Sequence, residues 1–502
     1  MSQQYSSMVD ATENEVVTVQ DAVRVSNKSL GRKFFKNTAA LAFGWNLNAL
    51  LRLVGASLVV RSFGVSVFGE YAVLVVWLTI AEWILDFGTT EVFVREANHD
   101  PERRSYFSRV FLTLKIVQAP LAAMVLVTGL IAMQYPHGLV VAGIASSLSL
   151  FFTAGVVYCR ANFKAALTME REVFSEFISV IAMLPLIPLV AHLRWGLIGV
   201  MGTYVFSRAV FCTGCVIQSR KTVLYSLRGI SWKDLRWGVN SSLTIGIIGF
   251  VVVLYTAADL LVLSRTASIS DVAVYSAALR FTMPLTMALN AIAVSVYPVL
   301  SLLKSPEQFH KTCQRAVNTT LLLGGLALVG LWCGAEFCMR LLGHQLIYGA
   351  GALRILAVVC VIKAVPMVIG PALFLVRAQK YALGYMLMAL LVKIAVVALA
   401  TLRFGYLGGA FGSLAVEACF LTPVTMYYVR KFTGFQIQFA GIWRLIPIVV
   451  IVIFVTRKIL PNGNMMAGIV AALLYPLLVL AFRVIDKSEM RALLRLRQSE
   501  QA

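Results

Sequence analysis

The stretch ALGYMLMALLVKIAVVALAT (residues 382–401) contains a single charged side chain, that of Lys393, in twenty residues. A helix of this length crosses the roughly 30 Å hydrocarbon core of a bilayer, so the stretch predicts a transmembrane helix. Similar apolar blocks recur along the 502-residue chain, of which 59% is apolar and only 13% is charged. A soluble protein has about 25% charged residues, so this composition excludes an ordinary soluble enzyme.

We predict about fourteen transmembrane helices and therefore an all-α integral membrane protein. The apolar blocks lack the in/out alternation of barrel strands, and only helices or closed barrels satisfy the backbone in lipid. The predicted spans are 38–61, 68–93, 108–133, 138–159, 174–193, 196–217, 240–264, 272–301, 316–336, 349–375, 382–401, 406–429, 443–460 and 465–484.

Lysine and arginine collect on one side of these spans. Loops on that side carry groups such as Arg103, Arg104 and Arg109, whereas the opposite loops carry mostly single basic residues such as Arg194. The positive-inside rule then predicts a multi-pass protein of the cell inner membrane with both termini in the cytoplasm. The formal net charge of +21 follows from this topology, and we expect no nucleic-acid partner.

Three short motifs recur at a spacing of about 205 residues. The pairs are Arg61-Ser-Phe-Gly-Val-Ser66 with Arg265-Thr-Ala-Ser-Ile-Ser270, Pro101-Glu102 with Pro306-Glu307, and Arg194-Trp-Gly196 with Arg403-Phe-Gly405. Helices 1–6 and 7–12 are therefore predicted to be two parallel six-helix repeats, followed by two C-terminal helices. Parallel repeats around a central site are typical of transporters.

The duplication predicts six segments along the chain. They are a disordered cytoplasmic tail (1–33), an N-terminal six-helix bundle (34–219), a basic cytoplasmic linker (220–239), a C-terminal six-helix bundle (240–430), helices 13 and 14 (441–485) and a basic cytoplasmic tail (486–502).

Several basic residues fall inside the predicted spans, where one charge costs roughly 2.5–3.5 kcal/mol on insertion scales. Lys115, Arg208 and Arg354 lie toward helix ends, from which long side chains can extend to the membrane surface. Lys363 and Lys393 lie at the centre of long apolar runs, and we expect both to line a central lumen. A lumen with an excess of cations would attract phosphate or pyrophosphate.

Four acidic residues also lie within spans, namely Glu82, Asp86, Asp259 and Glu417. Glu82 and Asp86 share a helix face and are expected at the depth of Arg52, which would allow a structural ion pair. Asp259 and Glu417 have either a structural role or a role in ion coupling. The chain contains no P-loop, HExxH or dinucleotide motif, so we predict no enzyme activity, cofactor or metal, and transport driven by an ion gradient.

Four stretches resemble the pattern of Wzx-type polysaccharide flippases. They are Arg61-Ser-Phe-Gly64, Phe68-Gly-Glu-Tyr71, Asp86-Phe-Gly88, and Asp259 with Tyr275-Ser-Ala-Ala-Leu-Arg280, within a resemblance from about Arg32 to Ile485. The resemblance implies a multidrug/oligosaccharidyl-lipid/polysaccharide exporter fold with alternating access, usually as a proton antiporter. It also implies a cationic lumen, for which Arg52, Arg280, Lys363 and Lys393 are the candidates.

The function expected from this resemblance is export of polyprenyl-pyrophosphate-linked oligosaccharide from the inner to the outer leaflet, for surface polysaccharide or exopolysaccharide biosynthesis. Its partners would be membrane lipids, a polysaccharide polymerase and other assembly proteins. Three alternatives stay open: a drug or metabolite antiporter of the same fold, a non-transporting scaffold of a glycan synthesis complex, and a lipid II-type flippase. An antiporter of organic cations is expected to have an acidic lumen, and a scaffold is expected to tolerate the loss of buried charges.

Overall fold

The computed structural model describes residue 44 and residues 46–220, 229–303, 305–438, 442–461 and 463–482. This part of the chain is almost entirely helical and contains no strand, which confirms the predicted all-α class. Ten of its helices are long and apolar enough to cross a membrane. Two of these, Asn46–His99 and Gln379–Thr433, each cover two predicted spans, which makes twelve. The last two predicted spans contain the shorter helices Leu445–Ile459 and Met465–Ala481, so the structure is compatible with about fourteen. The predicted tails, 1–33 and 486–502, lie outside the described residues.

The N-terminal bundle contains a first helical segment over residues 46–86, which is interrupted at Gly64 (φ +86°), and the helices α2 to α7. We call this segment the first helix. Their bounds are α2 Thr89–His99, α3 Arg104–Ala132, α4 His137–Ala165, α5 Glu170–Met183, α6 Leu186–His192 and α7 Gly196–Ser219.

The C-terminal bundle follows the connecting helix α8 (Trp232–Thr266) and is itself followed by a short hairpin. The bundle contains α9 Ile269–Leu302, α10 Pro306–Cys333, α11 Ala335–Leu342, η1 His344–Gly349, α12 Ala350–Ile369, α13 Ala372–Leu375, α14 Gln379–Val416, the π-helix η2 Glu417–Leu421 and α15 Thr422–Thr433. The hairpin contains η3 Ile442–Arg444, α16 Leu445–Ile459 and α17 Met465–Ala481.

Proline and glycine break several predicted spans. The span at 174–193 is divided at Pro185 into α5 and α6, and the span at 349–375 is divided at Gly370 and Pro371 into α12 and α13. Proline lacks an amide donor and clashes with the preceding turn, which explains both breaks. Within α14 the backbone reverses at Gly405, whose φ of +52° favours glycine.

The helix α8 begins earlier than its sequence pattern indicates. Its first turn, at Trp232, lies inside the predicted linker 220–239, because Ser231 and Asp234 form a capping box that starts the helix. Residues 221–228 of that linker lie outside the described part. The first half of α8 packs on the N-terminal bundle, where Trp83 Nε1 donates to the Gly246 carbonyl at 3.1 Å. Its second half packs on α14, so α8 joins the two bundles.

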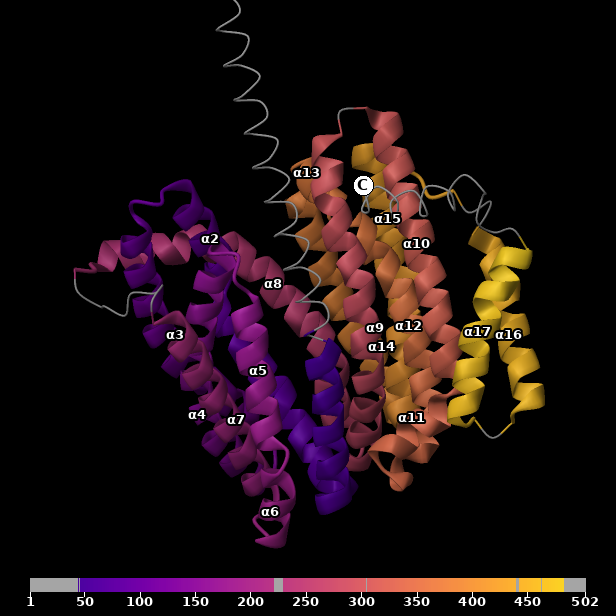
Figure 1. Cartoon of the computed structure of the whole chain (residues 1–502), viewed down its shortest axis with the longest axis horizontal. Coiled ribbons are helices and arrows are strands. Elements are labelled where there is room, and N and C mark those ends of the chain that lie inside the picture. The colour runs from indigo at the N-terminus through magenta and orange to yellow at the C-terminus, as the bar shows by residue number, and fades with distance from the viewer. Residues whose placement is uncertain are drawn as a thin grey trace, which may run out of the picture.

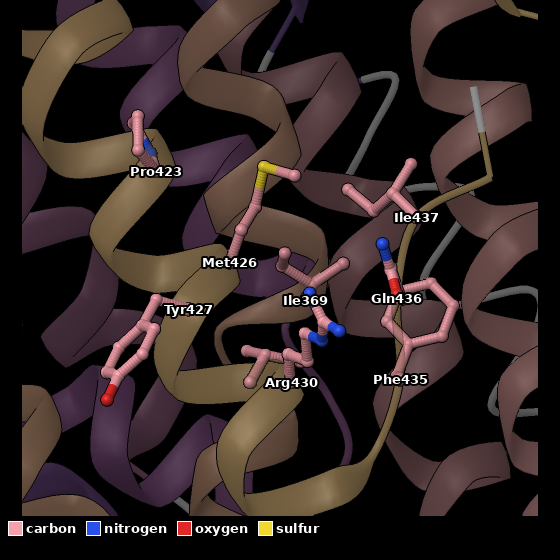
Figure 2. A pocket seen from close by; sticks show the side chains of 9 residues that line it. Ile369, Pro423, Met426, Tyr427, Arg430, Phe435, Gln436 and Ile437 are labelled. Carbon is pink, nitrogen blue, oxygen red and sulfur yellow. The ribbon is translucent and has the colours of Figure 1, made fainter.

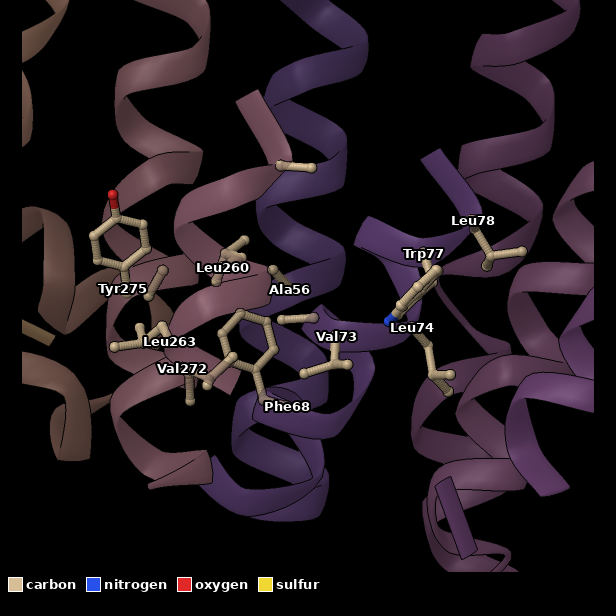
Figure 3. Packing of buried hydrophobic residues seen from close by; sticks show 14 of the residues in the cluster. Ala56, Phe68, Val73, Leu74, Trp77, Leu78, Leu260, Leu263, Val272 and Tyr275 are labelled. Carbon is tan, nitrogen blue, oxygen red and sulfur yellow. The ribbon is translucent and has the colours of Figure 1, made fainter. Parts of the chain in front are cut away.

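The two bundles converge at one end and diverge toward the other (Figure 1). At the converging end a hydrophobic core continues from one bundle into the other, and Figure 3 shows part of it, with Phe68 of the first helix near Leu263 and Val272 of α8 and α9. The diverging end carries the loops rich in lysine and arginine, such as that before α3. We call these the contact end and the basic end.

A pair of hydrogen bonds at the contact end supports the predicted duplication. Arg61 of the N-terminal bundle donates to the Leu341 carbonyl of the C-terminal bundle at 3.1 Å. Arg265, its counterpart in the repeat, donates in the reverse direction to the Gln134 carbonyl at 3.5 Å. Two arginines that match in sequence therefore make matching contacts across the interface.

The C-terminal hairpin packs against α10. Gly330 of α10 and Gly334, which follows the last residue of α10, approach Gly468 of α17 backbone to backbone, and small residues permit this close packing in membranes. An ion-pair group fixes the end of the hairpin: Glu336 pairs with Arg354 of α12, and Arg457 of α16 lies 2.9 Å from Glu336. Arg354, which the sequence placed at the membrane surface, is therefore held inside the fold.

Gly408 gives a first prediction about stability. A Cβ at this position would lie 2.1 Å from the Ala400 carbonyl oxygen, because the backbone folds back at Gly405. We expect Gly408→Ala to destabilise the protein by about 1–3 kcal/mol, as overpacking against a rigid backbone does. Thermal unfolding of the purified protein in detergent measures this change. Gly384→Ala, in the same helix with nothing within 4 Å, is the control, and equal melting temperatures for the two variants would contradict the prediction.

Candidate functional site

The two carboxylates predicted to pair with Arg52 do not do so. Arg52 instead forms an ion pair with Glu176 of α5, whose second carboxylate oxygen accepts a hydrogen bond from Asn48 at 3.0 Å. The Arg52 side chain stays 50% exposed. The prediction of an Arg52 pair with Glu82 or Asp86 is therefore wrong, because the helix that meets Arg52 is α5.

Glu82 is in an ion pair with a different partner. Arg208 of α7 lies 2.6 Å from the Glu82 carboxylate, and the Tyr204 hydroxyl donates to the same oxygen at 3.1 Å. The guanidinium also lies over the Tyr204 ring, 5.1 Å from its centroid. Arg208 does not extend to the surface as the sequence indicated, and the pair joins the first helix to α7.

Asp86 has a local structural role where the first helix ends. Its Oδ1 accepts hydrogen bonds from the Thr90 amide at 3.1 Å and the Thr90 hydroxyl at 2.6 Å, which satisfies the first turn of α2. The Lys115 ammonium is buried beneath this turn and donates to the Leu85 carbonyl and the Thr89 hydroxyl. The prediction that Lys115 extends to the membrane surface is wrong, because the broken helix offers buried acceptors.

A buried group of charged residues surrounds Tyr255 of α8, where this helix packs on α14 and η2 of the C-terminal bundle. The Lys393 ammonium lies 3.0 Å from Asp259 Oδ2, donates to the Tyr255 carbonyl at 3.1 Å, and lies 4.2 Å from the Tyr255 ring centroid. The Tyr255 hydroxyl donates to Glu417 Oε1 at 2.9 Å. We call Tyr255, Asp259, Lys393 and Glu417 the buried tetrad.

The buried tetrad is almost closed to solvent, with Lys393 3% exposed and Glu417 1% exposed. One oxygen of each carboxylate, Oδ1 of Asp259 and Oε2 of Glu417, has no hydrogen-bond partner within the described residues. Glu417 also begins the π-helix η2, an arrangement that often marks functional positions. Lys393 was expected in a lumen, but in this conformation it forms a buried ion pair.

The remaining two predicted cations lie apart from each other. Lys363 of α12 is half-buried and lies 5.8 Å from the Tyr255 ring centroid, next to the buried tetrad. Arg280 of α9 lies over Phe68 and Tyr71 of the other bundle, at 5.2 and 5.7 Å from their ring centroids. The structure therefore brings Lys363 and Lys393 together around Tyr255, and it places Arg280 between the bundles and Arg52 within the N-terminal bundle.

Sequence reasoning missed Glu176 and Tyr255. Glu176 follows Glu170 and Glu172 near the cytoplasmic end of its span and therefore looked like a surface residue. Tyr255 lies four residues before Asp259, and this spacing puts both residues on one face of a helix. The spacing was the sequence signal that could have placed Tyr255 beside Asp259. Within the described residues, no group of three or more His, Cys, Asp or Glu side chains has the proximity to hold a metal ion.

Comparison with known families gives one match. Residues 34–304, more than half of the chain, match the family described as polysaccharide biosynthesis protein. No curated protein matches the chain in sequence.

Solved structures of transporters share the fold. The lipid II flippase MurJ in an inward closed conformation superposes with a TM-score of 0.74 at 13% identity, over 88% of this chain and 98% of that chain. An inward-facing multidrug resistance MATE family transporter of the MOP superfamily gives 0.63 at 14%, over 77% and 96%. A MOP superfamily transporter from Pyrococcus furiosus gives 0.59 at 15%, over 80% and 95%. At these identities the similarity establishes the fold alone.

Proposed function

The chain belongs to the polysaccharide biosynthesis protein family of flippase type, and from this premise we propose that it exports a polyprenyl-pyrophosphate-linked oligosaccharide. The oligosaccharide unit moves from the inner to the outer leaflet of the cytoplasmic membrane and supplies surface polysaccharide or exopolysaccharide synthesis. The family match over residues 34–304 carries this proposal. A polysaccharide polymerase and other assembly proteins are the proposed partners.

Alternating access of the two bundles is the proposed mechanism. The bundles meet at the contact end and diverge toward the basic end, which the positive-inside rule assigns to the cytoplasm together with both termini. This arrangement supports a state that receives substrate from the inner leaflet. Arg52 and Lys363, which are both partly exposed, are the proposed first contacts of the pyrophosphate, while the polyprenyl tail stays in lipid.

Ion coupling is proposed to use the buried tetrad. The tetrad contains two carboxylates and one ammonium, so a proton on Glu417 would leave it without net charge. Loss of that proton would place an extra negative charge in a buried site, which would favour a conformation in which water reaches the Glu417 carboxylate. The other titratable or charged groups around Glu417 are Tyr255, Asp259, Lys393, Lys363 and Cys360. Release of the proton on one side of the membrane and uptake of a proton on the other side would drive the alternating-access cycle.

The paired arginines of the contact end give a prediction about the equilibrium between the two states. Arg61→Gln with Arg265→Gln removes two hydrogen bonds between the bundles, each worth about 0.5–1.5 kcal/mol, and leaves the bond from Ser57 to the Leu341 carbonyl in place. We expect the open population at this end to rise about tenfold. The measurement is the distance distribution between spin labels at Gly138→Cys and Gln345→Cys, both exposed, with Cys419→Ser in the background. Arg340→Gln, an exposed arginine next to the same carbonyl, is the control, and an unchanged distribution in the double variant would contradict this prediction.

The proposed function is tested in a deletion strain. Its lipids are extracted, and lipid-linked oligosaccharide is quantified together with surface polysaccharide. We expect loss of the polymer, with completed oligosaccharide-lipid retained on the cytoplasmic face. Accumulation of lipid II with normal polymer would show that the substrate is a peptidoglycan precursor and not the proposed oligosaccharide-lipid. Normal polymer with no retained lipid intermediate would favour a small-molecule antiporter or a scaffold.

A further inference from the structure

A pocket of about 380 Å³ lies where the C-terminal bundle meets the chain that leads to its hairpin. After α15 the chain turns at Gly434, whose φ is +72°, and continues without helix or strand over residues 435–438. Figure 2 shows Arg430 and Met426 of α15 pointing toward Phe435, Gln436 and Ile437 of this segment. The volume lies within the range of small-molecule sites in proteins.

The wall formed by residues 434–438 is held in place by α10. His310 Nε2 donates to the Thr433 carbonyl at 3.1 Å, at the start of the segment. Gln314 bonds both backbone groups of Gln438, donating to its carbonyl at 3.1 Å and accepting from its amide at 2.8 Å. Phe435 and Ile437 are buried in the core of the bundle. The pocket is therefore preformed and bounded by fixed side chains.

The side chains around the pocket indicate that it lies at the depth where lipid headgroups meet lipid chains. Beside it lies a group of aromatic rings on α14 and α15 that contact one another, namely Tyr381, Tyr385, Tyr427, Tyr428 and Phe432. Tyrosine is enriched at membrane interfaces, and Arg430 and Lys431 at the end of α15 are typical of the cytoplasmic one. From Arg430 the lining continues through Met426 to Pro423, seven residues or about 10 Å deeper along the helix.

The lining has a polar end and an apolar interior. Arg430 and Gln436 supply hydrogen-bond donors at the mouth, whereas Ile369, Met426, Phe435 and Ile437 form the walls. None of the lining residues is acidic, and no ion pair of Arg430 is found within the described residues. A ligand that matches this lining has an anionic head and a hydrocarbon chain.

We propose that this pocket binds an anionic phospholipid of the cytoplasmic leaflet. Its phosphate is held by Arg430 and Gln436, and one acyl chain lies along Met426 and Phe435 toward Ile369. The bound lipid stabilises the junction between the C-terminal bundle and the hairpin, since the pocket wall is the segment that connects them. The site is independent of the exported substrate and of the cationic residues proposed to bind it.

The test compares variants of the full-length purified protein in detergent with added phosphatidylglycerol or phosphatidylcholine. We expect phosphatidylglycerol to raise the melting temperature of the wild type more than phosphatidylcholine does. Arg430→Gln is expected to weaken phosphatidylglycerol binding about tenfold. Met426→Trp, which fills the pocket, is expected to abolish the rise. Lys431→Gln removes the neighbouring charge outside the lining and is expected to behave as the wild type does.

Three results would overturn the proposal. Equal losses in Arg430→Gln and Lys431→Gln would show that only general surface charge attracts the lipid. Equal stabilisation by the two phospholipids would show that the pocket does not recognise the anionic head. Displacement of bound phosphatidylglycerol by polyprenyl phosphate, followed by native mass spectrometry, would assign the pocket to a substrate-type lipid instead. None of these measurements uses transport, so the outcome is separate from that of the proposed function.

Discussion

Replacing Lys393 by Met is expected to destabilise the protein by about 3–5 kcal/mol and to abolish export, because it leaves a buried charge without its partner. The ammonium lies 3.0 Å from Asp259 and also stabilises the Tyr255 carbonyl. Without the Lys393 ammonium, the tetrad contains two carboxylates and no cation. The melting temperature and the yield of monodisperse protein measure the destabilisation, and surface polysaccharide in a complemented deletion strain measures export.

A double variant separates the structural role of Lys393 from a transport role. Lys393→Met with Asp259→Asn removes both charges of the pair and is expected to recover most of the lost stability. If the tetrad couples ion movement to transport, export stays low in this stable double variant. Full export in the double variant would assign the pair a purely structural role. Lys380→Met, an exposed position of the same helix, is the control.

The class of fold was predictable because a transmembrane helix is a local property of about twenty residues. The stretch at 382–401 forms the first part of α14, and the predicted repeat motif Arg403-Phe-Gly405 marks the point where that helix reverses. The family was predictable for a similar reason, since its motifs are short and contiguous, and the match over residues 34–304 confirms it.

The partners of the buried charges were not predictable from the chain alone. A pair such as Arg52 with Glu176 joins residues 124 positions apart, so it depends on which helices become neighbours and how each is rotated. Sequence proximity favoured Glu82 as the partner of Arg52, but α7 supplies Arg208 to Glu82. The same limit applies to Lys393, whose central position in an apolar run fits a lumen and a buried ion pair equally well. Assigning the four cations to a substrate site stays a prediction.

Lys363 offers the clearest test of that site, because it differs from Lys393 in its surroundings. It is half-buried, and within the described residues no carboxylate forms an ion pair with it. Its ammonium lies 5.8 Å from the centroid of the Tyr255 ring. Lys363→Gln therefore removes a charge without leaving a buried carboxylate unpaired. We expect the free energy of unfolding to change by less than about 1 kcal/mol, which the melting temperature measures.

Export by Lys363→Gln is expected to fall about 10- to 150-fold if the ammonium binds the pyrophosphate, since a charge-assisted hydrogen bond contributes about 1.5–3 kcal/mol. Initial rates of lipid-linked oligosaccharide appearance in the outer leaflet measure the effect. Lys363→Arg keeps the charge and should retain most of the rate, whereas Lys380→Gln, on an exposed helix end, should retain all of it. A stable Lys363→Gln protein with the wild-type rate would show that Lys363 does not bind the substrate, because this lysine has no ion pair among the described residues and its loss would then affect neither stability nor transport. Arg52 and Arg280 would remain as the candidates for the substrate site outside the buried tetrad.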